Sequence, residues 1–476
     1  MNVENTIAEL KHNFSNTADL VVRQIYTKTG ENVTLVWIEN IIDQQLLAQN
    51  IIFPIQNLEI AKTDSLEKKL LTSAISFSKV STTENISEIE SKLLDGFCVI
   101  FNDESSCYII VECAKWIVRL PSEPPTSAVI EGPREGFVED IITNTSLIRR
   151  RLRTKHLKIE DISLGNETNS HIKLVYLTNI ADPQVVEDVK EKLNKISIDG
   201  VIDSHYITEF LTNKKQQIFK QIGSTEKPDI ATAKILEGRI AILCDGSPIV
   251  LTVPYILLED LQSSNDYYTT PLRASMMRYL RLFAGIIAIL LPGLYIALLS
   301  YHLKTIPIKL LITITNSIQG IPLPPFLEVL FIIFLFEILY EASLRMPRYV
   351  GLALSVVGAL ILGDTAVKAG LVSPPAVLIV AITGVMSYTL PEQISQISFL
   401  RIVFTFLGGL LGLYGIIIGT IFLIGYLVSL ESFSTPYLAP FSPYIKSDQK
   451  DALSRSSLAK MKNRPNSIPN INRKRQ

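Results

Sequence analysis

The distribution of charge along the chain constrains its fold more than any other feature. The segment 282–430 carries only 11 charged side chains in 149 residues, whereas the remaining 327 residues carry 80. About one residue in four is charged outside this segment, as in ordinary soluble domains, against about one in fourteen inside it. Single soluble domains do not separate charge in this way. The sequence therefore predicts soluble domains joined to a membrane domain and argues against a purely soluble enzyme.

The charge balance and the absence of known motifs exclude several functional classes. The formal net charge is −1, so no global field draws the chain to nucleic acid. The first 20 residues include charged side chains and no apolar core of a secretory signal. We therefore expect a cytosolic location for the soluble part, with its four cysteines reduced. No nucleotide-binding, protease, hydrolase or calcium motif occurs, so we expect no enzyme, no cofactor and no bound metal.

Alternating strand and helix patterns before the apolar segment predict two α/β lobes. The first lobe, 1–130, contains two hairpin patterns, at 19–38 and 96–112. The second lobe spans 131–270. Its expected elements are a helix at 137–152, strands at 157–162 and 172–177, helices at 183–195 and 228–236, and a hairpin at 238–253. Because helix and strand signals alternate, local patterns do not fix the topology of the first lobe.

Residues 271–435 are predicted to form an all-α, multi-pass membrane domain. A run of 20 uncharged residues makes about 30 Å of helix, which is enough for one crossing. The five apolar segments are 282–301, 326–342, 349–367, 376–390 and 402–430. The last segment is longer than one crossing requires and short for two. We therefore expect four to six crossings.

Basic residues indicate the orientation of this domain. Arg273, Arg278 and Arg281 precede the first apolar segment, which places the lobes in the cytoplasm. The basic tail, 436–476, is also expected to be cytoplasmic, partly disordered or facing lipid. Two cytoplasmic ends require an even number of crossings. Either the last apolar segment crosses twice, or residues 306–320 enter the membrane as an extra element.

Carboxylates inside the second apolar segment are candidates for an ion path. Glu337 and Glu341 lie about 40° apart on one helix face, and Glu328 lies on the opposite face. Buried intramembrane carboxylates commonly face a bundle interior or a water-filled path. The alternative for Glu341 is an ion pair with Arg345, four residues on.

Small residues on the next apolar segment extend the candidate ion path. Ser355 and Ala359 lie one helical turn apart and could face the same lumen as Glu337 and Glu341. The alternative is a structural role, because small residues on one stripe let helices approach closely.

A basic run in the second lobe is a candidate contact surface. Residues 149–153 read Arg-Arg-Arg-Leu-Arg, one turn of helix without aromatic partners for bases, which is a weak signal for nucleic acid. We expect a lobe or subunit contact made by charged residues here and at the preceding turn. The candidates are Arg134, Glu135, Arg149, Arg150 and Arg151.

Ordered strings across most of the chain resemble the A subunits of spore germinant receptors, the GerA family. The resemblance extends from about residue 19 to the tail. Its strings include Glu131-Gly-Pro-Arg-Glu-Gly-Phe137, Leu147-Ile-Arg-Arg-Arg-Leu152, Leu323-Pro-Pro-Phe-Leu-Glu328, Gly370-Leu-Val-Ser-Pro-Pro375 and Tyr437-Leu-Ala-Pro-Phe-Ser-Pro443.

The resemblance implies a multi-pass protein of the spore inner membrane, with its lobes on the spore-core side. It implies as partners a transporter-like, nutrient-binding B subunit, a C subunit that is a lipoprotein, further copies of the chain and membrane lipid, but no nucleic acid. The implied activity is a nutrient-gated cation channel formed by an oligomer. The alternatives are a non-conducting scaffold or assembly subunit, and a stage V A-type relative without a dedicated nutrient-binding partner.

Overall fold

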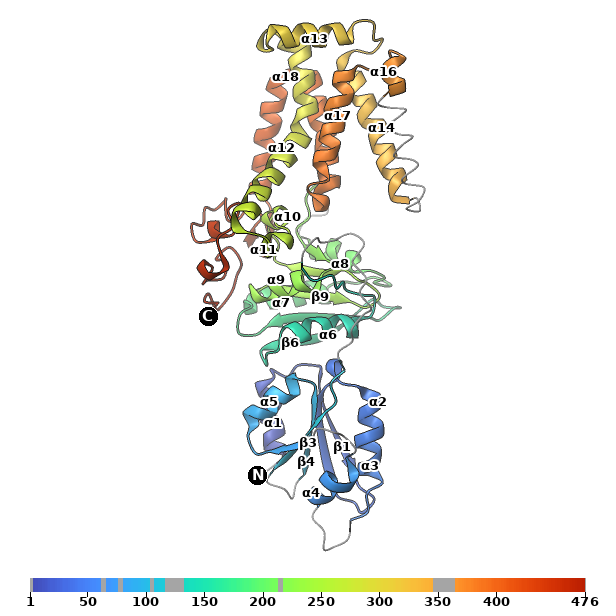
Figure 1. The fold of residues 1–476 in the computed structure, drawn as a ribbon, viewed down its shortest axis with the longest axis vertical. Coiled ribbons are helices and arrows are strands. Elements are labelled where there is room, and N and C mark those ends of the chain that lie inside the picture. The colour runs from blue at the N-terminus through green and yellow to red at the C-terminus, as the bar shows by residue number, and fades with distance from the viewer. Residues whose placement is uncertain are drawn as a thin grey trace.

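The structure is a computed structural model of the 476-residue chain. It describes residues 3–60, 66–75, 80–102, 107–115, 132–212, 217–345 and 364–475. Two sheet-containing lobes and a helical region follow one another along the long axis of the molecule (Figure 1). We refer to the described residues 3–115 as lobe 1, 132–261 as lobe 2 and 271–428 as the helical region.

Lobe 1 is built on a five-stranded antiparallel sheet in the order β1-β2-β4-β5-β3. The central strands are almost wholly buried, because helices cover both faces (Figure 1). Both predicted hairpins are confirmed, as β1 with β2 and β4 with β5. The bounds are α1 Val3–Asn13, β1 Leu20–Tyr26, β2 Asn32–Ile38, α2 Gln44–Leu47, α3 Phe53–Gln56, α4 Leu66–Lys69, β3 Val80–Thr83, α5 Ile86–Leu94, β4 Phe97–Asn102 and β5 Tyr108–Glu112.

Lobe 2 contains a second five-stranded antiparallel sheet, in the order β6-β7-β9-β10-β8. Successive residues of its central strands enter different cores: Leu174 packs with α7 and α8, and Val175 packs with α6 and α9. The sheet is therefore covered on both faces. The bounds are α6 Ile141–Arg151, β6 Leu157–Leu164, β7 Ser170–Leu177, α7 Pro183–Asn194, α8 Ser204–Leu211, β8 Gly223–Thr225, α9 Pro228–Leu236, β9 Ile240–Cys244, β10 Val250–Val253, α10 Leu258–Leu261 and α11 Asn265–Tyr268.

The two lobes share one topology. In each, a helix precedes the first hairpin, the third strand lies at the far edge of the sheet, and a helix precedes the last hairpin. The strand order, first-second-fourth-fifth-third, is the same in both. The N-terminal part of the chain is therefore a tandem repeat of one α/β unit.

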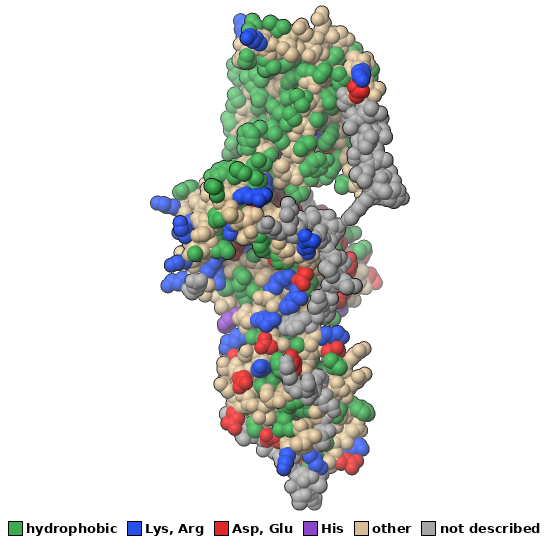
Figure 2. Space-filling model, in the orientation of Figure 1, with side chains coloured by type: hydrophobic (Ala, Val, Ile, Leu, Met, Phe, Trp, Pro, Cys, Tyr) green, Lys and Arg blue, Asp and Glu red, His purple; other side chains and the backbone are tan. Residues whose placement is uncertain are grey.

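The helical region carries long helices that run along the axis of the molecule, with α13 lying across the end farthest from the lobes (Figure 1). Hydrophobic side chains make up most of the visible surface of this region, with a few charged ones at its far end, whereas most charged side chains in this view lie on the lobes and the tail (Figure 2). The bounds are α12 Pro271–Tyr301, α13 Ile308–Ile318, α14 Pro325–Arg345, α16 Ala366–Lys368, α17 Pro374–Ser387 and α18 Ile394–Val428. Most of the predicted segment 349–367 lies outside the described residues.

The last apolar segment folds as two antiparallel arms. Gly412 interrupts α18 with φ 63° and ψ −146°, a conformation that a side chain would oppose. Gly419 on the second arm lies against Leu407 and Phe404 of the first. The arms are therefore 394–411 and 413–428, each about 25 Å long. The helix over residues 306–320, α13, does not run alongside the other helices (Figure 1).

Two described helices, 271–301 and 391–428, are long and apolar enough to cross a membrane. The second of these includes both arms of α18. The helix α14 has comparable length but carries three carboxylates and an arginine.

The structure differs from the sequence prediction for the tail. Residues 436–475 fold as successive turns against lobe 2 and the start of α12 instead of remaining disordered. The amide of Ile471 donates to the Ile180 carbonyl, and Asn470 pairs with Ala181. The cause is that basic tail residues find fixed acceptors: Arg464 donates to the carbonyl of Leu236, and Arg475 pairs with Glu237.

Candidate functional site

An ion pair joins α14 to the first arm of α18 inside the helical region. The Glu337 carboxylate accepts hydrogen bonds from Arg401 and Ser398. The Arg401 side chain is 2% exposed, and its guanidinium lies 5.5 Å from the Phe336 ring centre. Because this arginine is removed from water, the Glu337 carboxylate is its essential counter-charge.

The two carboxylates predicted to share a helix face have different surroundings. Glu341 is exposed and accepts hydrogen bonds of 2.9 and 2.5 Å from Arg345. The structure thus contains the alternative i,i+4 ion pair and does not join Glu341 to Glu337. The other two candidates for the ion path, Ser355 and Ala359, lie outside the described residues.

Glu328 has the opposite orientation on α14, as its helical angle predicts. Its side chain is fully buried and accepts a hydrogen bond from the backbone amide of Ser373, the N-cap of α17. The helix α14 therefore contacts α17 through Glu328 and α18 through Glu337.

Glycine allows α12 and the first arm of α18 to touch through their backbones. A Cβ on Gly408 would lie 2.2 Å from the Gly293 carbonyl oxygen, and one on Gly293 would lie 2.2 Å from that of Phe404. The glycine-rich last segment thus includes a close-packing face, as small residues in membrane helices often provide. Gly425, by contrast, has no atom within 4 Å of such a Cβ.

The basic run of α6 reaches lobe 1 at one position. Arg149 is fully buried and pairs with Asp19 of lobe 1. Arg150 and Arg151 instead bind Glu135 within lobe 2. Burial raises the pKa of Glu135, but hydrogen bonds from the two arginines outweigh burial and keep that pKa below its usual value of 4.5. Arg134 is exposed.

A third buried arginine fixes the base of the helical region. Arg278 of α12 lies 3.0 Å from carboxylate oxygens of both Asp266 and Asp451, and Arg281 also binds Asp266. Arg455 of the tail donates to the carbonyls of Asp266 and Thr269. Two of the arginines that indicated orientation by the positive-inside rule are therefore held by protein carboxylates.

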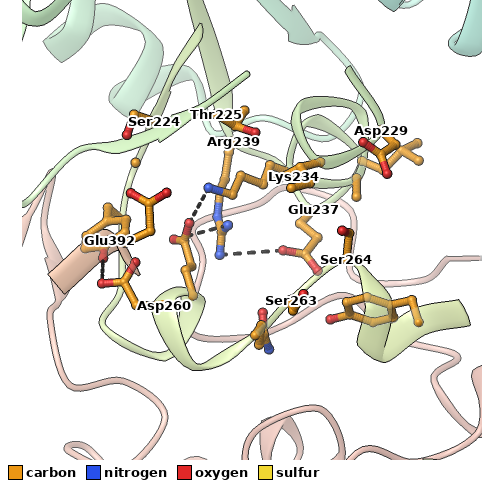
Figure 3. Close-up of a pocket in the computed structure, with 18 of the residues that line it drawn as sticks. Ser224, Thr225, Asp229, Lys234, Glu237, Arg239, Asp260, Ser263, Ser264 and Glu392 are labelled. Carbon is orange, nitrogen blue, oxygen red and sulfur yellow. Dashed lines mark hydrogen bonds and ion pairs between the residues drawn. The ribbon is translucent and has the colours of Figure 1, made fainter. Parts of the chain in front are cut away.

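A cavity of about 720 Å³ lies where lobe 2, α10, α11 and the tail meet (Figure 3). Lys234 of α9 and Arg239, which precedes β9, extend to Glu259 of α10, at 2.6 and 3.2 Å. Arg239 also lies 3.5 Å from Glu237. Sequence reasoning did not predict this cavity, because its lining residues are spread from 220 to 475.

One corner of the cavity joins lobe 2 to the helical region. Lys220 lies 2.6 Å from Glu392, in the loop between α17 and α18, and 3.4 Å from Asp260. Burial raises the pKa of Asp260 even though Lys220 and hydrogen bonds from Gln393 and Tyr255 oppose that shift. The described residues include no group of three or more acidic, histidine or cysteine side chains that could hold a metal ion.

Comparison with known proteins identifies the family. The family model of the Bacillus/Clostridium GerA spore germination protein matches residues 8–467. The chain therefore belongs to the GerA family. It is 34% identical to spore germination protein KA of Bacillus subtilis (strain 168), over 99% of this chain and 87% of that protein. It is 32% identical to spore germination protein GerLA of Bacillus cereus, over 98% and 95% of the two chains.

Another relative of this chain, from Bacillus subtilis (strain 168), bears the name uncharacterized membrane protein YfkQ. It is 35% identical to this chain, over 94% of the chain and 88% of the relative. Among solved structures, the N-terminal domain of the A subunit of the Bacillus megaterium spore germinant receptor GerK3 aligns with 53% of this chain and 94% of its own. Its TM-score is 0.41 and its sequence identity is 24%.

Proposed function

We propose that this GerA-family chain is the A-type subunit of a nutrient-sensing germinant receptor in the spore inner membrane. In this proposal its helical region contributes to a cation path in an oligomer, and its lobes lie on the spore-core side. Family membership supports the receptor role, since relatives across nearly the whole length are named spore germination proteins. The B and C subunits proposed as partners follow from the same membership.

The positions of the two ends of the helical region support a multi-pass arrangement. The chain enters α12 beside lobe 2, and after α18 it returns there, where the Leu257 amide donates to the Tyr437 carbonyl. Both ends thus lie on one side, which requires an even number of crossings. We propose six, made by α12, α14, the segment predicted at 349–367, α17 and the two arms of α18. The same proposal includes the domain boundaries at residues 130, 270 and 435, which separate the two lobes, the membrane domain and the tail.

The observation that carries the cation-path proposal is the Glu337–Arg401 pair. A carboxylate in the membrane interior attracts cations, and a buried arginine on a neighbouring helix neutralises it. In the resting state, Arg401 therefore occupies the position that a passing cation needs. Movement of α18 relative to α14, driven by nutrient binding to a partner, would free Glu337 for conduction. Ser355 and Ala359 remain proposed members of the path.

The experiment compares spores carrying Glu337→Gln with spores carrying Glu341→Gln, a matched change on the same helix. Potassium release is followed after adding a nutrient mixture that triggers the parent spores. We expect Glu337→Gln to alter the rate or the ion selectivity of release and Glu341→Gln to leave both unchanged. Release from Glu337→Gln spores with unchanged rate and selectivity would contradict the proposed path.

A scaffold role is the second candidate, and the same ion pair favours it. A carboxylate that an arginine neutralises also has a purely structural use, as an ion pair that ties two helices together. A scaffold predicts that Glu337→Gln and Ser355→Ala change the amount of assembled receptor and not the potassium-to-sodium selectivity of release. Measuring the receptor level and the selectivity in the same spores separates the two functions.

A further inference from the structure

Glu328 is a buried carboxylate that is only half satisfied. One of its oxygens accepts the Ser373 amide hydrogen at the N-terminus of α17, an arrangement that favours a negative charge. The other oxygen, Oε2, is buried and makes no hydrogen bond with the described residues. No lysine or arginine of the described chain forms an ion pair with Glu328. A charged Glu328 therefore lacks a positive partner among the described side chains.

A second buried polar group is directed at the same place from α12. The Tyr295 side chain is 7% exposed and packs in one buried cluster with Val329 and Val372, the neighbours of Glu328 and Ser373. Its hydroxyl is buried and makes no hydrogen bond of acceptable geometry within the described residues. The fully buried Ser373 hydroxyl accepts one long hydrogen bond, 3.4 Å from the Ala376 amide. Three oxygen-bearing side chains from three segments thus converge with unused bonding capacity.

The surroundings of these groups are apolar. Tyr295 belongs to a buried cluster that includes Val329, the neighbour of Glu328, and Val372, the neighbour of Ser373. An isolated charged carboxylate in such surroundings is strongly disfavoured, so the group is either paired with a cation or protonated. Bound water would satisfy the free oxygens but would not supply the missing charge.

We propose that Glu328, Tyr295 and Ser373 bind a monovalent alkali cation where α12, α14 and α17 meet. Oxygen ligands and a single carboxylate suit a singly charged hard cation, whereas divalent calcium is usually held by several carboxylates. The bound cation neutralises Glu328 and ties the three helices at the end of the bundle far from the lobes. Glu337 lies nine residues further along α14, about 13 Å away, so this is a separate site from the Glu337–Arg401 pair.

This inference rests on the proposed placement of the helical region in the membrane, but its test does not use ion flux. The full chain is purified into lipid nanodiscs, and its thermal unfolding midpoint is measured in potassium chloride, sodium chloride and choline chloride at equal ionic strength. We expect at least one alkali cation to raise the midpoint, relative to choline, with a saturable concentration dependence.

Variants locate the effect. Glu328→Gln keeps the acceptor for the Ser373 amide and removes the charge, so we expect it to abolish the cation-dependent shift. Tyr295→Phe should raise the half-saturating concentration several-fold, and Glu341→Gln, on the same helix outside the site, should respond like the parent chain.

Equal midpoints in choline and in both alkali chlorides for the parent chain would overturn the site. So would a full cation response in Glu328→Gln. If that variant does not fold, an unchanged half-saturating concentration in Tyr295→Phe overturns the site instead. Because potassium release is not measured here, the cation site and the Glu337 path can fail independently.

Discussion

Asp19 of lobe 1 and Arg149 of lobe 2 form a two-point ion pair across the lobe boundary. The Arg149 Nη2 atom lies 3.0 Å from Oδ1 and 2.7 Å from Oδ2 of Asp19, and both side chains are fully buried. The Thr17 hydroxyl also donates to Asp19, at 2.6 Å, and the Ala18 amide donates to the Ile159 carbonyl of lobe 2. This pair fixes how one α/β unit sits on the next.

Replacing Asp19 by Asn should therefore destabilise the chain strongly. The change leaves the Arg149 charge buried without a counter-charge, which typically costs about 3–5 kcal/mol. Thermal unfolding of the full chain in nanodiscs measures the effect. The control is Asp95→Asn, which removes a more exposed interlobe pair with Arg153 at 3.4 Å and should cost less than about 1 kcal/mol. Equal losses in the two variants would show that burial of the Asp19 pair is unimportant.

The Glu337–Arg401 pair should show strong coupling in a double-mutant cycle. Glu337→Leu alone leaves the buried Arg401 unpaired and should cost about 3–5 kcal/mol, whereas Arg401→Met leaves the partly exposed Glu337 unpaired and should cost less. The double variant replaces both charges with apolar groups, so we expect it to be less destabilised than the sum of the two single variants by about 1–3 kcal/mol. Unfolding of the four proteins gives the coupling free energy. Strictly additive losses would contradict the observed contact.

The contact between Gly293 and Gly408 predicts different effects for two similar substitutions. Gly408→Ala places a methyl group against the backbone of α12 and should destabilise the helical region by about 1–3 kcal/mol. Gly425→Ala meets no atom and should be neutral or stabilising by up to about 1 kcal/mol, because alanine favours helix. Yield of folded protein and unfolding midpoints compare the two. Comparable losses at both positions would argue against close packing at Gly408.

The stability of the full chain should depend on pH through Glu135. Its pKa is below 4.5 in the folded chain, because hydrogen bonds from Arg150 and Arg151 outweigh the opposing effect of burial. The stabilisation is therefore present above pH 4.5 and is lost as the pH falls through the lowered folded-state pKa. Glu135→Gln should lower stability at pH 7 and flatten the decline between about pH 5 and 3. An unchanged acid limb of the midpoint-against-pH curve would rule out this contribution.

Local patterns predicted the secondary structure of the lobes well. The strands β1, β2, β4 and β5 lie where alternation and turn residues placed them, since side-chain period and turn chemistry are properties of neighbouring residues. The repeat of one topology in both lobes was not predictable in this way. Strand order depends on which distant strands share an edge, and no local pattern encodes that.

The ion pairs show that local sequence patterns predict contacts between neighbouring residues but not between distant ones. The pair of Glu341 and Arg345 follows from spacing along one helix, and the sequence analysis raised it. Arg401, which pairs with Glu337, is 64 residues away from it, and Asp451, one of the two partners of Arg278, is 173 residues away, so these pairs could be found only in the folded chain. The tail shows the same effect. The groups that hold it lie in lobe 2 and beside α12, far away in sequence, so its own residues did not predict that it folds.

The sequence by itself determined that charged α/β lobes precede an apolar helical region, and its ordered motifs indicated the GerA family. Those properties follow from the amino-acid composition, the spacing of apolar residues and the order of the motifs along the chain. The tertiary structure decided that the last apolar segment turns back at Gly412, that Arg149 joins the lobes, and that Glu328 and Glu337 face different helices. Each of these features depends on residues that are distant in sequence and that packing brings together. Burial of these residues also strengthens the interactions between their charges.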